Sequence, residues 1–344
     1  MLRPHTSSKP VSIKDIARIA NVSHSTVSRA LRNSPLVHPS TAEQIRKIAS
    51  ESGYRASAVA RSLVNRRTHT IGVVVTTIAD PFNGEVVSGI EDKANHLGYS
   101  VFLANSKSEP ERELRVVHSF EERRVDGIIV TSSRVGAHYA DLLERMNIPV
   151  VFLNNHNPGN FAYSVSIDDG NGAREATNHL LDLGHTRIGY IGDEFGLRSN
   201  ENRLSGFRGA LRSRGVKEHA EAMESGDGSC AEGAAAMERI LKRTPLPTAV
   251  FCYNDQTALG AMSALHARGI RIPEEISVVG FDDLPAASYA SPPLTTVRQP
   301  MEQMGRRAME ILAGLLSGET AGIEGVEKFD GELIVRRSTA SPKK

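Results

Sequence analysis

The sequence of 344 residues has no tryptophan, only two cysteines, and few aromatic residues, which make up 5% of the chain. It also lacks any apolar run near the roughly 18–20 residues that a membrane-spanning helix requires. Residues 1–10 contain no apolar run and so show no secretory signal. Cys230 and Cys252 stand apart from clustered histidines or carboxylates, which argues against a disulfide framework or a metal site. We therefore expect a soluble, cytoplasmic protein with no metal and no membrane contact.

The net charge of +1 conceals an uneven distribution of charge along the chain. Residues 1–67 contain 12 lysines and arginines and three acidic residues, a net charge of +9. The rest of the chain contains 29 basic and 37 acidic residues, a net charge of −8. A basic N-terminal region on an acidic body is typical of a protein that binds nucleic acid through that region. The length indicates two or three domains.

Residues 12–31 predict two short helices joined by a tight turn. The first has apolar residues at the i, i+3, i+4, i+7 spacing of one helix face, and Ser12 with Asp15 forms a capping-box pattern. Ser23 is a favourable N-cap for the second helix. This arrangement suits a helix-turn-helix motif, whose second helix contacts base edges in the major groove, although a solvated amphipathic pair has the same pattern. The polar face of the second helix consists of His24, Ser25, Ser28, Arg29 and Arg32.

A third helix and a short linking segment follow this motif. Ser40 with Glu43, or the pair one residue further on, predicts the helix start, and Gly53 stands where a C-cap glycine is expected. Residues 57–66 favour a helix of only ten residues, which is marginal in water on its own. The segment is either a plain linker or a switch element that folds only when something stabilises it.

From residue 70 onward, short apolar runs alternate with longer amphipathic segments. The expected strands are 71–76, 99–104, 127–130, 149–154, 164–167, 188–191, 249–253, 276–280 and 295–299. The expected helices are 82–97, 111–124, 137–146, 170–183, 201–214, 231–242, 255–268 and 301–316. Two rounds of strand and helix, about 70–168 and 169–297, predict an α/β body with two doubly wound parallel-sheet lobes. A ligand cleft is then expected between the lobes, at the carboxyl ends of the strands.

The usual patterns of enzyme sites are missing from this body. The sequence has no phosphate-binding G-x-x-x-x-G-K-[ST] loop, no G-x-G-x-x-G after the first strand, no G-x-S-x-G elbow and no H-E-x-x-H pair. Asp168–Asp169 and Asp282–Asp283 follow predicted strands and are candidate paired carboxylates for acid–base chemistry. Adjacent acids in that position more often provide one helix cap and one ligand contact, so we expect neither catalysis nor a cofactor.

Ten short segments, spread over nearly the whole chain, match the sequence motifs of a single protein family, in the same order along the chain. They are 12–31, 59–63, 71–74, 80–82, 124–129, 183–185, 203–207, 254–255, 273–283 and 293–297. With these segments the chain resembles the lactose-repressor (LacI/GalR) family of bacterial transcription regulators. The resemblance implies a small all-α helix-turn-helix head and a periplasmic-binding-protein-like body of two lobes. Its implied domains are a DNA-binding head at 1–56, a hinge helix with linker at 57–69, and a two-lobed body at 70–340. Crossovers near 168, 298 and 328 would give one lobe about 70–168 and 299–327 and the other about 169–297 and 328–338.

The resemblance also implies how the protein binds DNA: two chains of a homodimer bind the half-sites of a pseudo-palindromic operator. His24 and Ser25 then contact bases, and Arg29 pairs with guanine. Ala60 allows the two hinge helices to approach closely in the minor groove, where Leu63 wedges into a central base step. The full implied set is Ser23, His24, Ser25, Thr26, Ser28, Arg29, Ala60 and Leu63, of which Ser23, Thr26 and Ser28 hold phosphates.

A small-molecule effector, a sugar or sugar derivative, is implied in the cleft, where it changes the angle between the lobes and hence the DNA affinity. The chain departs from the family at Gly228, where many relatives carry an aromatic residue, and Phe161, Tyr163 or Phe195 is a candidate replacement. Ala56 stands where a proline often precedes the hinge. The implied effector-binding residues are Asp80, Phe82, Asn83, Asn154, Arg203, Asn254 and Asp282.

Four functions are compared on this basis. A ligand-controlled repressor agrees best with the sequence, and a regulator controlled by a protein co-repressor comes next. A sugar-binding transport component predicts a signal peptide in place of the basic head, and an enzyme on the same scaffold predicts turnover of the ligand. Activation stays open beside repression, because it depends on where the operator lies relative to the promoter.

Overall fold

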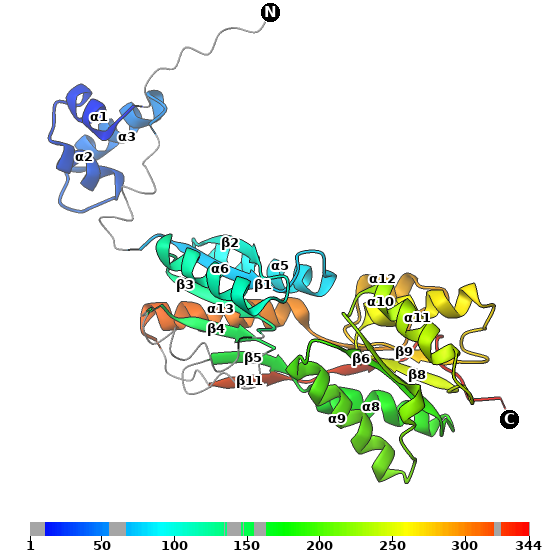
Figure 1. Ribbon diagram of the computed structural model, residues 1–344. Coiled ribbons are helices and arrows are strands. Elements are labelled where there is room, and N and C mark those ends of the chain that lie inside the picture. Colours follow the sequence, from blue (N-terminus) through cyan, green and yellow to red (C-terminus); the bar gives the residue numbers. More distant parts are fainter. Residues whose placement is uncertain are drawn as a thin grey trace, which may run out of the picture. The chain divides into compact units, whose positions relative to one another are not determined.

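The computed structural model describes residues 11–54, 67–133, 135, 146, 148–154, 163–319 and 325–343. Contacts within the chain form two compact units, residues 1–68 and 69–344 (Figure 1). Within the described residues, every helix is too short or too polar to cross a membrane. Ala56, residues 57–66 of the predicted hinge and linker with Ala60 and Leu63, and most of the predicted helix 137–146 lie outside the described residues.

The N-terminal unit is a bundle of three helices, α1 (Ile13–Ile19), α2 (His24–Leu31) and α3 (Pro39–Glu51). One apolar face of each helix contributes to a small core: Ile16, Ala17, Val27, Ala30, Val37, Ala42, Ile45 and Ala49. The predicted stripes of apolar residues therefore lie inside, and the polar face of α2 lies outside. Gly53 follows α3 with φ of +66°, a left-handed conformation that favours glycine.

The predicted N-terminal caps are confirmed for two of the three helices. Ser12 and Asp15 form the predicted capping box of α1, and the Ser23 hydroxyl caps α2. The predicted start of the third helix is wrong, because α3 begins at Pro39 after His38, without a side-chain cap. Proline fits the first helical position because an N–H there would have no partner within the helix.

The larger unit contains a six-stranded parallel sheet with the strand order β11-β5-β4-β3-β1-β2. Val73 in this sheet packs against α5 and α13 on one face, while its neighbour Val74 packs against α6 on the other. The strands are β1 (Thr70–Val75), β2 (Ser100–Asn105), β3 (Gly127–Thr131), β4 (Val150–Leu153), β5 (Tyr163–Ile167) and β11 (Val326–Phe329). The helices are α5 (Pro81–His96), α6 (Pro110–Glu122) and α13 (Met301–Ser317).

A second parallel sheet has four strands in the order β7-β6-β8-β9. Its strands are β6 (Ile188–Asp193), β7 (Met223–Gly226), β8 (Ala249–Cys252) and β9 (Ser277–Val279). Helices cover both of its faces: α8 (Asp169–Asp182) and α9 (Arg198–Ser213) on one, and α10 (Cys230–Leu241) and α11 (Asp255–Ala267) on the other. A 3-10 turn, η3 (Ala220–Ala222), precedes β7, and a short helix, α12 (Pro285–Tyr289), follows β9. Two sheets, each covered by helices on both faces, confirm the predicted doubly wound α/β body.

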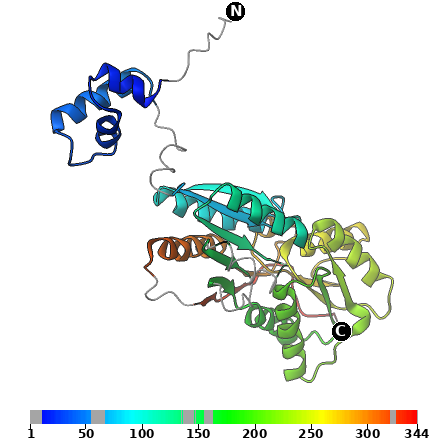
Figure 2. The same cartoon turned by 60° about the vertical axis from the view of Figure 1, so that its left-hand side comes forward.

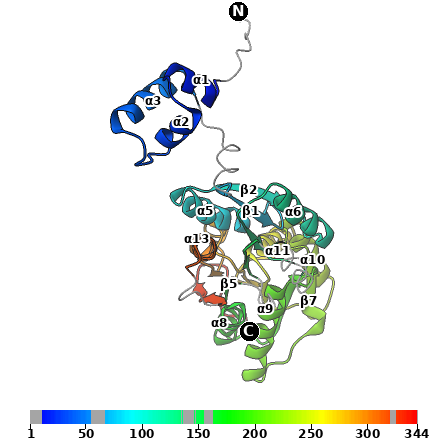
Figure 3. The ribbon, with the colours of Figure 1, turned by 90° about the vertical axis from the view of Figure 1, so that its left-hand side faces the viewer.

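The chain passes between the two sheets three times. It leaves the first sheet after β5 and returns through α13, whose crossing with α5 is close: a Cβ on Gly305 would lie 2.1 Å from the Val86 carbonyl oxygen. Figures 2 and 3 show α13, in orange, beside α5 and the first sheet. After β11, the chain runs back toward the second lobe, and β12 (Glu332–Ile334) pairs antiparallel with β10 (Thr296–Arg298) in a separate two-stranded sheet. The two lobes are thus interleaved in sequence.

Most predicted elements agree with the structure to within two or three residues. Three short strands, β7, β11 and β12, and the helix α12 were not predicted. The exposed β11 strand reads Val-Glu-Lys-Phe and has little apolar character, because it lies at the edge of its sheet. Its pairing with β5, some 160 residues earlier in the sequence, is a tertiary contact that a local pattern does not reveal.

Candidate functional site

The exposed face of α2 carries the residues predicted to contact DNA bases. His24, Ser25 and Arg29 are exposed, whereas Val27 and Ala30 on the opposite side are buried. Within the described residues, the Arg29 guanidinium has neither a hydrogen bond nor an ion pair. An exposed face of donors and acceptors on the second helix of such a pair is suited to hydrogen bonding with base edges.

The hydroxyl of Ser23 has a structural role at the start of the same helix. It accepts a hydrogen bond from the Thr26 amide at 3.2 Å and lies 2.7 Å from the Ser25 hydroxyl and 2.8 Å from the Thr26 hydroxyl. Thr26 and Ser28 are half-buried. These hydroxyls form a local cluster at the helix N-terminus, where backbone N–H groups point outward and favour an anion such as phosphate.

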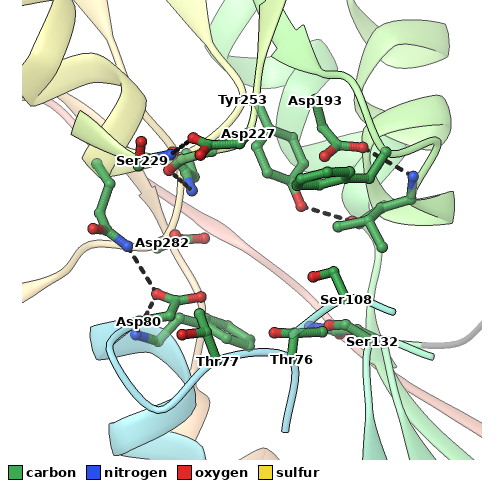
Figure 4. A pocket seen from close by; sticks show the side chains of 18 of the residues that line it. Thr76, Thr77, Asp80, Ser108, Ser132, Asp193, Asp227, Ser229, Tyr253 and Asp282 are labelled. Atoms are coloured by element: carbon green, nitrogen blue, oxygen red, sulfur yellow. Dashed lines mark hydrogen bonds between the residues drawn. The ribbon is translucent and has the colours of Figure 1, made fainter. Parts of the chain in front are cut away.

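A cavity of about 440 Å³ lies in the larger unit (Figure 4). Its walls come from the loops that follow the strands of both sheets, the location at which doubly wound folds bind ligands. From the first sheet come Thr76, Thr77, Ala79, Asp80, Phe82, Asn105, Lys107, Ser108, Ser132 and Asn154. From the second sheet and the crossover come Asp193, Phe195, Leu197, Ser199, Arg203, Asp227, Gly228, Ser229, Tyr253, Asn254, Gln256, Asp282 and Gln299.

Six of the seven residues predicted to bind the effector line this cavity: Asp80, Phe82, Asn154, Arg203, Asn254 and Asp282. The seventh, Asn83, needs correction, because its side chain is turned away from the cavity and is only 2% exposed. Its amide group donates hydrogen bonds to the Thr76 hydroxyl and the Thr77 carbonyl and accepts one from the Thr131 hydroxyl. Asn83 therefore holds the loop that contains Thr76 and Thr77. It points in a different direction from Phe82 because successive residues of a helix are rotated by about 100°.

Arg203 lines the cavity but is held by the protein itself. Its Nε donates to Asp169 Oδ1 at 2.8 Å and its Nη1 to the Tyr253 carbonyl at 2.7 Å. The guanidinium also lies over the Phe281 ring, 3.7 Å from the ring centre. Because both Arg203 and Asp169 are buried, the pair fixes the cavity wall before any ligand arrives.

Two carboxyl groups of the cavity have perturbed acidity. Burial raises the pKa of Asp282 well above its ordinary value, against the opposing effect of the Arg203 charge. Gln299 Nε2 donates to Asp282 Oδ1 at 2.6 Å. Burial also raises the pKa of Asp80, whose Oδ1 accepts hydrogen bonds from the Phe82 amide and from Gln256 Nε2, both at 3.0 Å. These groups lie in a partly desolvated site, which strengthens their interaction with a charged or polar ligand.

Direct contacts join the two lobes beside the cavity. The hydrogen bond from Gln256 to Asp80 links α11 of the second sheet to the loop after β1 of the first. Leu284, which follows β9, packs into the apolar cluster of the first sheet with Phe82 and Met301. A ligand placed between the lobes therefore contacts surfaces that already meet each other.

Sequence reasoning missed most of the polar residues that come from loops. Lys107, Ser108 and Ser132 have positive φ values of 53°, 56° and 46°, as do the predicted residues Asn154 and Asp282 with 53° and 125°. Such conformations are strained in residues other than glycine and tend to gather at binding sites. The positive φ values that mark these loop residues are visible in the backbone of the structure and cannot be read from the sequence.

The sequence left open which aromatic residue takes the place of the one that many relatives carry at the position of Gly228. Gly228 lines the cavity with φ of +83°, a conformation that disfavours an aromatic side chain. Phe195 and Tyr253 line the cavity, whereas Tyr163 does not, and Phe161 lies outside the described residues. Of the three predicted replacements, Phe195 is thus the one placed at the cavity.

The geometry defines a two-lobed binding body in a chain that also carries a helix-turn-helix unit, and comparisons with known proteins agree. A profile of the bacterial regulatory proteins of the lacI family matches residues 12–57, and one of the periplasmic binding protein-like domain matches residues 177–339. The HTH-type transcriptional repressor PurR of Haemophilus influenzae (strain PittEE) is 35% identical over 335 residues, which are 96% of this chain and 99% of that protein.

Solved structures show the same similarity. The crystal structure of the lac repressor dimer bound to operator and the anti-inducer ONPF matches with a TM-score of 0.87 and 30% identity, over 96% of this chain and 100% of that one. The complex of the transcriptional regulator CelR with cellobiose matches with a TM-score of 0.73 and 31% identity, over 95% and 99%. The chain belongs to the LacI family of bacterial transcription regulators, as the sequence predicted. It is a DNA-binding transcriptional repressor under the control of a ligand.

Proposed function

We propose that the protein acts in the cytoplasm as a homodimer that binds a pseudo-palindromic operator, and that a sugar or sugar derivative in the cavity alters its operator affinity. In this proposal residues 1–56 bind DNA, residues 57–69 form the hinge, and residues 70–340 bind the effector and the second chain. The observation that carries the proposal is the cavity itself, which is built from the strand ends of both sheets.

The lining of the cavity supports a polyhydroxylated ligand. Phe82, Phe195 and Tyr253 offer apolar ring surfaces, and the remaining lining residues are mainly hydroxyl, amide and carboxylate groups. Carboxylates and amides form directional hydrogen bonds with hydroxyl groups, and aromatic rings pack against sugar rings. The structural match to a complex with cellobiose also supports a sugar.

The contacts between the lobes provide a route from ligand to DNA affinity. A ligand shifts the operator affinity only if it binds one lobe arrangement more tightly than the other. The Gln256–Asp80 hydrogen bond and the packing of Leu284 beside Phe82 depend on that arrangement, and Asp80 and Phe82 also line the cavity. A ligand that contacts these two residues therefore has the differential interaction that such control requires.

On the DNA side, we assign base contacts to His24, Ser25 and Arg29. We assign phosphate contacts to the hydroxyls of Ser23, Thr26 and Ser28, and minor-groove contacts to Ala60 and Leu63. Exposure of the first three and the unpaired Arg29 guanidinium support the assignment. Arginine pairs with guanine through two hydrogen bonds, which specifies one base pair in each half-site.

The test is selection of bound sequences from random duplex DNA by the purified full-length protein at a fixed salt concentration, because phosphate contacts weaken steeply with salt. We expect a palindrome with a flexible central step. Leu63→Ala should then weaken binding to this operator far more than binding to unrelated DNA. Selection without any palindrome would contradict the homodimer, and equal losses on both DNAs would contradict the wedge.

The recovered operator then serves as the probe for the effector. Neutral monosaccharides and disaccharides are added to the protein–operator complex, and the change in the operator dissociation constant is measured. An operator complex that responds to no small molecule, but to a partner protein from the same cell, would replace the cavity-based proposal by control through a protein co-repressor.

A further inference from the structure

The cavity has more carboxylates than cationic groups. Four aspartates line it, whereas Lys107 and Arg203 are the basic residues among the described lining residues. Figure 4 shows the four carboxylates around one space, and they are Asp80, Asp193, Asp227 and Asp282. Arg203 has two acidic partners, the buried Asp169 at 2.8 Å and Asp282 at 3.8 Å, so its single positive charge is more than balanced within the protein. The space open to a ligand is therefore acidic, with Lys107 as its main counter-charge.

The amide side chains at the cavity increase this bias toward hydrogen-bond acceptors. Three of the five amide side chains that line the cavity donate to the protein: Gln256 Nε2 donates to Asp80, Gln299 Nε2 to Asp282, and Asn254 Nδ2 to the Gly228 carbonyl at 3.0 Å. Two amide oxygens, by contrast, are buried without a hydrogen-bond partner among the described residues, Asn154 Oδ1 and Gln299 Oε1. A ligand that satisfies such a site must supply donors.

Asp282 is the most buried of the four aspartates at the cavity. It is 4% exposed, accepts a hydrogen bond from Gln299, and lies 3.8 Å from Arg203 Nη1. The negative charge of Asp80 adds to the field at Asp282, and burial lowers the local dielectric screening. An anionic ligand at this end of the cavity meets repulsion, whereas a cation is attracted.

We propose that the effector is a polyhydroxylated molecule that carries a protonated amine, as amino sugars do, with the ammonium group at the Asp80–Asp282 end of the cavity. An ammonium group has three donors and no acceptor, which complements an acceptor-rich site better than a hydroxyl does. Phosphorylated and carboxylated sugars are correspondingly excluded. The inference rests on the proposed role of the cavity as the effector site.

The test compares three matched probes in each of the gluco, galacto and manno series: the 2-amino sugar, the neutral parent sugar and the sugar 6-phosphate. Their dissociation constants are measured by calorimetry on the full-length protein at about pH 6.5, where the amines are largely protonated. We expect that in one series the amino sugar binds about tenfold more tightly than its neutral parent, and that the phosphate binds most weakly. Tighter binding of a neutral or phosphorylated probe, or binding of none of the nine, would overturn the inference.

Two variants locate the preference. Asp282→Asn keeps the shape of the side chain and removes its charge, so the amino sugar should lose most of its advantage over the neutral parent. Asp330→Asn removes an exposed carboxylate far from the cavity lining and should leave the advantage unchanged. An advantage that survives in Asp282→Asn would place the ammonium elsewhere and overturn the inference.

Proton counting gives an independent signature. Burial raises the pKa of Asp80 and Asp282 in the free protein, and a cation bound between them should lower both. Binding should therefore release protons at any pH at which either carboxyl of the free protein is partly protonated, and a pH series locates that range. Calorimetry in two buffers of different ionisation enthalpy should show this release for the amino sugar and not for the neutral parent. Equal proton exchange for both probes would count against the assigned position.

The outcomes separate this inference from the proposed function. A neutral sugar that releases the operator more effectively than any amino sugar would leave the repressor mechanism intact and overturn the inference. An amino sugar that binds tightly in the cavity without changing operator affinity would uphold the inference and contradict the proposed effector control.

Discussion

The exposed face of α2 and the wall of the cavity use arginine in opposite ways. On α2, Arg29 is exposed and has no hydrogen bond or ion pair within the part of the chain that the structure describes. In the cavity wall, Arg203 is 2% exposed, and it is bonded to Asp169 and to the Tyr253 carbonyl. A free side chain can adjust to a base edge, whereas a paired one fixes the surface against which a ligand binds. Under the proposed function, the same residue type serves recognition in one region and support in the other.

The largest effect that tests this contrast is expected for Arg203→Ala. It removes the arginine from a buried ion pair with Asp169, a loss that typically costs about 3–5 kcal/mol of folding free energy. Urea unfolding of the full-length protein measures this loss in the transition of the larger unit. Arg203→Lys keeps the charge and should fall between wild type and Arg203→Ala, which provides a folded variant if the alanine form does not accumulate.

The matched control on the other side of the comparison is Arg29→Ala. A solvent-exposed arginine without partners should change the free energy of unfolding by less than about 0.5 kcal/mol. If Arg29→Ala and Arg203→Ala destabilised the protein equally, the distinction between recognising and supporting arginines would be wrong.

The next effect in size is the loss of operator affinity in Arg29→Ala, which should be smaller than the loss of folding free energy in Arg203→Ala. Loss of a pair of hydrogen bonds to guanine should cost about 1–3 kcal/mol of operator binding and relax the preference at one base pair in each half-site. The measurement is a set of dissociation constants for operators with each base at every half-site position. An unchanged preference at all positions, with only a uniform loss of affinity, would reassign Arg29 to phosphate contact.

The fold was largely predictable because its main elements are encoded locally. Periodic apolar residues, caps such as Ser12 with Asp15, and glycines at helix ends place most helices and strands within a few residues. Strand β11 escaped prediction since its partner β5 lies far away in the sequence and only the pairing makes it a strand. The exposed sequence of β11 has no apolar alternation that would reveal it.

The cavity was predictable only in part, for a different reason. The resemblance to a family predicted that Asp80, Phe82 and Asp282 lie at the cavity, where the structure has them. A family resemblance gives the residue type at each position but does not give the hydrogen-bond partners of the side chain. The resemblance therefore predicted that Asn83 faces the cleft, whereas its side-chain amide donates to the Thr76 hydroxyl and the Thr77 carbonyl and does not line the cavity. Whether a polar side chain binds a ligand or holds the site depends on tertiary contacts.

Histidine shows the same contrast as arginine, with the smallest expected effect. His24 is exposed on α2, whereas His185 is buried, with its ring nitrogens 2.8 Å from the Thr248 hydroxyl and 2.9 Å from the Ala340 carbonyl oxygen. Burial lowers the pKa of His185 below the ordinary value of 6.5. Between the lowered pKa and 6.5 the unfolded chain therefore binds more protons than the folded one, so this contribution to stability is complete above 6.5 and falls as the pH decreases.

His185→Gln should accordingly make the pH dependence of stability shallower below about pH 6.5, because glutamine keeps a donor for Ala340 and does not titrate. One proton corresponds to a slope of about 1.4 kcal/mol per pH unit, which is the upper limit of the change. Burial lowers the pKa of the nearby His179 as well, so part of the slope should persist in the variant. Urea unfolding across a pH series measures these slopes, with His24→Gln as the exposed control. Equal slopes for wild type and His185→Gln would show that the protonation of His185 does not contribute to the pH dependence of stability. The contrast between buried and exposed side chains would then not extend from arginine to histidine.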